Sequence, residues 1–125
     1  MTEPGQPKGG AMAETMTIDR SQWVEQLDAV TREHEGDEIT IEVLDKDWGD
    51  AHEAQRMPFS YVSYDKKDDV VIIGVGGSSA AWPVLLRHMV WHPTEVSLAV
   101  VGDATVLRST EPDGTVTLAS IGGRR

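Results

Sequence analysis

The feature that most constrains the fold lies near the C-terminus, where three short apolar segments alternate with tight-turn residues. The segments are residues 96–101, 104–109 and 115–121. Gly102-Asp103 stands in the first gap and Pro112-Asp113-Gly114 in the second. Such residues provide the backbone conformations that tight hairpins require. The pattern predicts a meander of three strands.

Further strands are predicted before this meander. Residues 38–45 alternate apolar and polar side chains with the two-residue period of a half-buried strand. Residues 59–64 and 70–75 flank a polar turn at 65–68, which predicts a hairpin. Because residues 70–75 are rich in β-branched side chains with little alternation, both faces of that strand should be covered. The polar stretch 46–57 receives no assignment.

A helix is predicted over residues 20–34. Asp19 can cap its start, and Trp23, Leu27 and Val30 share one face at helical spacing. Gly36 stands where a left-handed residue would end the helix. The pattern is that of an amphipathic helix with Trp23 in the core.

Residues 78–93 have two interpretations. Pro83 suits the first turn of a helix, whose buried face would include His88 and Trp91 and which Pro93 would end. The alternative is a bent strand over residues 85–90. The helix is the favoured interpretation.

The elements together predict an α+β fold. No alternation of strand, helix and strand appears, so the sheet should be mainly antiparallel. We expect the N-terminal amphipathic helix to pack on a small sheet, or on an SH3-like or Sm-like partly open barrel, of five to six strands.

The chain of 125 residues fits one domain. Residues 1–17 are rich in glycine and proline and have no apolar period, which predicts a disordered tail. The domain is therefore expected over residues 18–121, with a short tail at 122–125. No apolar run reaches the ~20 residues that a membrane-spanning helix needs.

Composition excludes several classes of function. The chain has no cysteine, which rules out disulfides, thiol catalysis and cysteine-ligated metals and allows a reducing compartment. The net charge of −10 opposes non-specific binding to nucleic acid, which depends on Lys and Arg. We therefore expect a cytoplasmic protein that binds neither nucleic acid nor membrane.

Several short stretches resemble a known family. They are Trp23, Glu42-Val43-Leu44, Ser63-Tyr64-Asp65 with Asp69-Val70, Leu86-Arg87-His88-Met89 with His92-Pro93, and Asp113-Gly114. Over residues 18–121 the chain resembles an uncharacterised bacterial family of unknown function, common in actinobacteria. The resemblance implies a bacterial single domain and brings no activity, cofactor or catalytic residue.

His88 and His92 are the candidate metal ligands. In a helix their spacing would place both rings on one face, as in two-histidine metal sites. No acidic residue occurs between residues 70 and 94, so a third ligand, such as His52, would have to come from another segment. The alternative is one histidine hydrogen-bonded in the interior and one at the surface. We expect no cofactor, and His88 and His92 remain weak candidates for a metal.

The span from residue 33 to residue 53 holds nine acidic residues against one lysine, and thus −8 of the net charge. It is a solvated acidic face, a weak cation site or a docking surface for a basic partner. Two tryptophans in polar surroundings could anchor such a contact, since exposed aromatic side chains dominate many interfaces. The candidate interaction residues are Trp48, Asp45, Asp47, Asp50 and Trp82.

The sequence contains no G-x-S-x-G nucleophile motif, and whether the protein is an enzyme stays open, with a non-enzymatic role favoured. The leading prediction is a protein-interaction module of the bacterial cytoplasm that binds a protein partner or itself. One alternative is a metal-dependent protein or enzyme that uses His88 and His92. The other is an Sm-like RNA binder.

Overall fold

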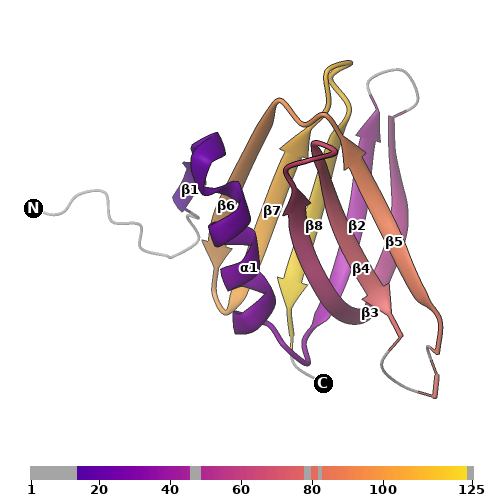
Figure 1. Ribbon diagram of the computed structural model, residues 1–125. Coiled ribbons are helices and arrows are strands. Elements are labelled where there is room, and N and C mark those ends of the chain that lie inside the picture. The colour runs from indigo at the N-terminus through magenta and orange to yellow at the C-terminus, as the bar shows by residue number, and fades with distance from the viewer. Residues whose placement is uncertain (1–13, 46–48, 78–79, 82, 124–125) are drawn as a thin grey trace, which may run out of the picture.

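The computed structural model describes residues 14–45, 49–77, 80–81 and 83–123, without the side chains of residue 14 and residues 49–54. These residues form mostly strands (Figure 1). The elements are β1 (Glu14–Thr17), a 3-10 turn η2 (Arg20–Gln22), α1 (Trp23–Glu33), β2 (Glu38–Asp45), β3 (Gly49–Asp65), β4 (Val70–Gly76), β5 (Leu85–Trp91), β6 (Glu95–Val101), β7 (Ala104–Thr110) and β8 (Val116–Gly122).

All eight strands belong to one antiparallel sheet in the order β1-β6-β7-β8-β2-β3-β4-β5. The sheet is open, with β1 at one end and β5 at the other. The predicted fold class, a helix on a sheet or partly open barrel of five to six strands, is therefore wrong. It missed strands in the segments that were assigned to the tail, left without assignment or interpreted as a helix.

The long strand β3 turns the sheet into two layers. Its first part pairs with β2 and its last part, from Phe59 to Asp65, pairs with β4. Within the part that pairs with β2, at the register shift between Ile39 and Ile41, Arg56 has a φ of 52°, and its N–H donates to Thr40 Oγ1 at 3.1 Å in place of the regular ladder. This irregularity lets the strand bend. Figure 1 shows β3, β4 and β5 in front of β7, β8 and β2.

The core lies between the two layers. Ile73 of β4 and Val90 of β5 are fully buried, as are Leu107 of β7 and Ile121 of β8. The expectation that both faces of β4 are covered is confirmed. Adjacent residues of that strand point to opposite faces, and both Val70 and Val71 are buried.

The predicted helix is confirmed, with α1 as its regular part. Trp23, Leu27 and Val30 are buried, and Trp23 Nε1 donates to the carbonyl of Ile18 at 2.9 Å. α1 packs against β3, and the Thr31 hydroxyl bonds to the backbone of that strand.

Other expectations have mixed outcomes. The strand at 38–45, the hairpin around residues 65–68 and the C-terminal meander are confirmed. Four residues of the predicted tail, Glu14–Thr17, instead form β1 and pair with β6. This strand has no apolar alternation of its own, and its partner lies far along the chain. Residues 1–13 lie outside the described residues.

The helix favoured for residues 78–93 is wrong, and the alternative strand is correct. β5 pairs with β4 from Leu85 to Trp91. An apolar run of this length fits either element locally, so pairing with β4 decides the outcome. Trp91 consequently lies at the sheet end and is 46% exposed, whereas the helix would have buried it.

Among the described residues, none of the helices has the length and apolar character needed to cross a membrane.

Candidate functional site

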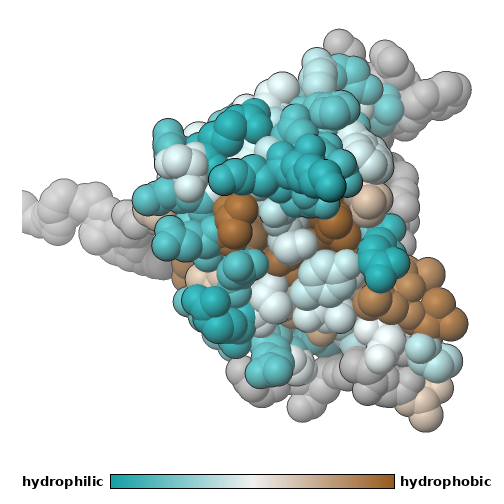
Figure 2. Space-filling model, viewed as in Figure 1, coloured by the Kyte–Doolittle hydropathy of each residue, from teal (hydrophilic) through white to brown (hydrophobic). Residues whose placement is uncertain are grey.

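Among the described residues, strand β5 is the end strand of the sheet and pairs only with β4. Large apolar side chains are exposed along it and just before it: Val84 at 64%, Leu86 at 52% and Trp91 at 46%. Figure 2 shows a hydrophobic patch over the start of β5, on a face that is otherwise mostly hydrophilic. Exposed apolar groups beside an unpaired backbone edge are characteristic of surfaces that pair with another strand.

The two ends of the sheet differ in how they are protected. β1 has four residues, and short edge strands resist unwanted pairing, whereas β5 has seven. The only residue in β5 with a permanent charge is Arg87, whose Nε donates to the Tyr61 hydroxyl at 3.0 Å. Tyr61 lies on β3, so the Arg87 side chain crosses the sheet away from the unpaired edge. No permanently charged side chain on β5 therefore opposes the pairing of another strand with that edge.

A polar cluster lies at the end of β5, where the chain leaves the sheet. His92 and Asp69 are non-glycine residues with positive φ angles, 51° and 55°. The N–H of His92 donates to the Asp69 carbonyl at 2.8 Å, and its Nδ1 lies 3.2 Å from Asp69 Oδ2. Left-handed backbone at such residues is costly and persists only where surrounding contacts enforce it.

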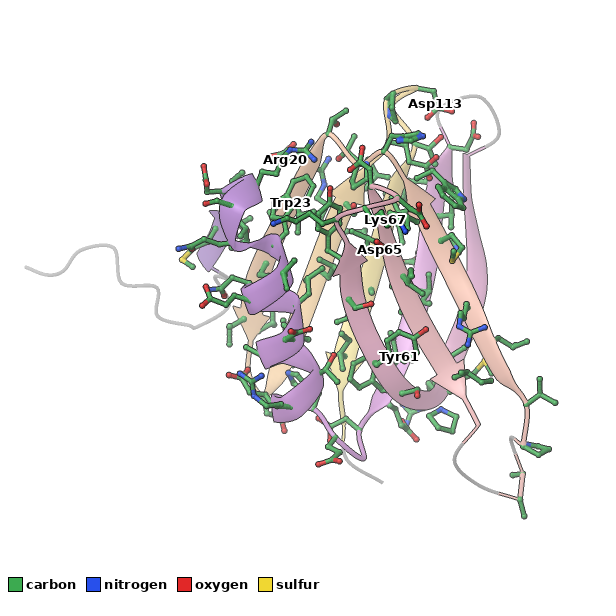
Figure 3. The ribbon with its side chains drawn as sticks, in the orientation of Figure 1. Arg20, Trp23, Tyr61, Asp65, Lys67 and Asp113 are labelled. Atoms are coloured by element: carbon green, nitrogen blue, oxygen red, sulfur yellow. The ribbon has the colours of Figure 1, made fainter. Side chains whose placement is uncertain are left out.

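Asp69 is the centre of this cluster. Its Oδ1 accepts hydrogen bonds from the Tyr64 hydroxyl and from Arg20 Nη1, the latter at 3.3 Å. Arg20 Nη2 also donates to the carbonyl of Pro93 at 3.0 Å, and the guanidinium lies 4.2 Å from the centre of the Trp23 ring. Figure 3 shows Arg20 and Trp23 at one end of the helix, near the turn that carries Asp65 and Lys67. The cluster thus fastens the ends of β4 and β5 to the start of the helix.

The ionisation of the cluster follows from these bonds. The Tyr64 hydroxyl, followed by His92 and Arg20, holds the pKa of Asp69 below its ordinary value of 3.8. Burial, and then the bond to Asp69, raise the pKa of Tyr64 above its ordinary value of 10.0. At neutral pH Asp69 is therefore a carboxylate and Tyr64 a phenol, and the phenol donates its hydrogen bond to the carboxylate.

The structure separates the two histidines that were candidate metal ligands. His88 lies on β5 and its Nε2 is 3.2 Å from Thr117 Oγ1, whereas His92 contacts Asp69. In the described part of the chain, no three His, Cys, Asp or Glu side chains are grouped as metal ligands would be. The side chain of His52, suggested as a third ligand, lies outside the described residues. A metal at His88 and His92 stays a prediction.

Most of the predicted interaction residues fall outside the part of the chain that the structure describes. Trp48, Asp47 and Trp82 lie outside the described residues, as does the side chain of Asp50. Asp45 is the last residue of β2 and is half-buried. A docking role for the acidic span stays a prediction.

Sequence reasoning assigned no role to Arg20, Tyr64 and Asp69. Arg20 is 44 residues from Tyr64 and 49 from Asp69, and it meets them only because η2 lies beside the turn between β3 and β4. Tyr64 and Asp69 are five residues apart and meet across the predicted hairpin, but the hairpin pattern does not indicate which side chains bond there. The edge character of β5 was missed because the order of strands depends on long-range pairing.

Comparison with known proteins finds matches that cover most of the described residues. A family model described as a family of unknown function, DUF5335, matches residues 14–121. An uncharacterised protein of Aquifex aeolicus (strain VF5) is 29% identical over 102 residues, which cover 81% of this chain and 86% of that protein. No solved structure gives a significant match. The matched residues begin with β1 and end within β8, so the chain belongs to the family of unknown function DUF5335.

Proposed function

We propose that this protein is a non-enzymatic interaction module whose β5 edge pairs with the β5 edge of a second copy. The observation that carries the proposal is the unpaired seven-residue edge strand flanked by exposed apolar side chains. Antiparallel pairing of two such edges would join two sheets into one and satisfy the outward backbone groups of both strands. An isologous contact brings the same side chains of both copies together, with Leu86 on one face of the joined sheet and Trp91 on the other, because the two residues are an odd number of positions apart on β5.

Charge supports a second copy as the occupant. The chain carries −10 overall, yet residues 70–94 contain no acidic residue. At this edge two copies can therefore approach without bringing carboxylates of β4 and β5 together. Like charges elsewhere on the surface are screened beyond the ~8 Å Debye length of physiological salt.

The test is the molar mass in solution. We expect sedimentation velocity and light scattering on the full chain to show a reversible dimer as the concentration rises from about 10 to about 500 μM, a range suited to a modest interface. Leu86→Glu should shift the protein to monomer, because it puts a charge into the apolar contact. A monomer throughout this range would refute the proposal.

A matched control is available on β6, next to the opposite end of the sheet. Val101 is 42% exposed, and Val101→Glu adds the same charge there. This variant should dimerise like the unmodified protein. Equal dissociation of both variants would show that added charge alone drives the copies apart, and it would also contradict the β5 pairing.

The proposal includes a bacterial cytoplasmic location, which a chain without cysteine tolerates. Cell fractionation with a tagged copy tests it. The wider distribution of the family, mainly in actinobacteria, is also a proposal, and the source organisms of its members test it. The Sm-like RNA-binding alternative, which an Sm-like strand pattern favoured, stays a prediction that the net charge of −10 opposes.

A further inference from the structure

A pocket of about 240 Å³ lies between α1 and the strands β1, β6 and β7. The helix packs against β3, which leaves this space on its other side. Val30 is buried and Leu98 half-buried in the apolar wall. Met16 and Val100 line the pocket too, but both are exposed, at 58% and 61%. A cavity of ~150 Å³ accepts benzene, so this one has room for about ten heavy atoms.

The side chain of Thr105, a polar residue of the pocket wall, is held in position by a buried histidine. Thr105 Oγ1 lies 2.8 Å from His34 Nε2, and His34 Nδ1 lies 2.7 Å from Asp37 Oδ2, all on buried residues. Whichever group donates in the bond between Thr105 and His34, the Thr105 oxygen keeps at least one acceptor lone pair, and Thr105 lines the pocket.

Among the described residues of the pocket wall, the only charged one is Glu33, the last residue of α1. Its carboxylate is also an acceptor, and Gln26, on the same helix, adds an amide. The pocket thus combines an apolar wall with acceptors and one negative charge. This chemistry suits a donor or a cation and opposes an anion.

We propose that this pocket binds a small primary amine with an apolar body, its ammonium group directed at Glu33 and Thr105. The proposal is independent of self-association, because β5 contributes no residue to the pocket.

The experiment compares three probes with the same phenyl body and different head groups. Binding of 2-phenylethylamine, 2-phenylethanol and phenylacetate to the full chain is followed by backbone amide NMR shifts at pH 7. We expect the amine to bind most tightly and the carboxylate roughly tenfold more weakly. Glu33 attracts the ammonium group of the amine and repels the carboxylate of phenylacetate. The shifts should map to α1, β6 and β7. Equal affinity for all three probes, or shifts elsewhere, would overturn the proposal.

Variants separate charge from shape. Glu33→Gln should reduce the preference for the amine over phenylacetate to about twofold, since the exposed charge pair is lost. Glu25→Gln is the matched control on the same helix, because Glu25 is exposed and lies outside the pocket wall. It should leave the preference unchanged. A preference that survives Glu33→Gln would contradict the role of this carboxylate.

Filling the space should abolish binding. Ala29 lines the pocket on α1, and Ala29→Leu adds a larger side chain there without introducing a poor helix former. Because a filled site can also disturb packing, Val100→Trp provides a second variant at an exposed position of the pocket wall. Amine binding that persists in both folded variants would overturn the proposal.

Discussion

Thr31 on α1 forms the two backbone hydrogen bonds with Val62 on β3 that a neighbouring strand would otherwise form. Its hydroxyl accepts a hydrogen bond from the Val62 N–H at 2.9 Å and donates to the Val62 carbonyl at 2.8 Å. At this position the opposite side of β3 pairs with β4. The Thr31 side chain therefore satisfies both backbone groups of Val62 on the side that faces α1.

Thr31→Val should therefore destabilise the fold by about 1–3 kcal/mol, the cost of leaving part-buried polar groups without partners. Chemical denaturation measures this cost. Thr94→Val is the control, because that hydroxyl is exposed and its acceptor, the Thr110 carbonyl, keeps the bond from the Thr94 N–H. A loss below about 0.5 kcal/mol in Thr31→Val would mean that water replaces the hydroxyl.

Trp23→Ala should cost about 3–5 kcal/mol, as expected for the loss of a large core aromatic. The ring is 2% exposed, contacts the Tyr64 ring edge-on at 4.9 Å and carries the hydrogen bond to Ile18. Val24→Ala, one residue along the same helix at an exposed position, should change the free energy of unfolding by less than about 0.5 kcal/mol. Similar losses in both variants would contradict this account of the core.

Gly74 is required because the Tyr61 ring lies against it. A Cβ at this position would come within 2.3 Å of Tyr61 Cε1. Gly74→Ala should therefore cost about 1–3 kcal/mol, as overpacking usually does. The cost should nearly vanish in a Tyr61→Ala background, which a double-mutant cycle by denaturation would reveal. An unchanged cost in that background would assign the effect to the backbone instead.

Stability should fall in acid through Asp69. Because the folded pKa of Asp69 lies below its ordinary value of 3.8, its contribution is complete above that pH and is lost as the pH falls through the folded pKa. Asp69→Asn should be less stable than the unmodified protein at pH 6, and the difference should shrink below about pH 4. Denaturation at several pH values tests this, and a constant difference would refute it.

The alkaline limb has the opposite sign. The folded pKa of Tyr64 lies above 10.0, so its contribution is complete below pH 10 and is lost as the pH rises through the folded value. The chain has two tyrosines, so Tyr61→Phe leaves Tyr64 as the one that ultraviolet titration follows. In this variant the titration midpoint should lie above 10.0, and a midpoint at or below 10.0 would contradict the assignment.

Local pattern predicted the elements whose partners are near in sequence, and it failed where distant pairing decides. The helix with buried Trp23 and the meander joined by Gly102 follow from periodicity and turn chemistry. β5 and the first half of β3 do not follow from local pattern. The apolar run of β5 and the polar, acidic run of β3 adopt strand geometry only because they pair with the strands beside them. The cluster around Asp69 includes Arg20, which is 49 residues away along the chain, so no local spacing indicates that contact.

The pairing of β1 with β6 has a consequence for synthesis on the ribosome. Glu14 pairs with Val100, so the first strand emerges long before its partner exists. It must wait while β2, β3 and β4 form their hairpins, and it can dock only after β6 has left the exit tunnel. Non-local pairings of this kind close late in folding. We therefore expect β1 to join the sheet of the nascent chain later than β2, β3 and β4, and to be among the first strands to exchange amide protons in the finished protein.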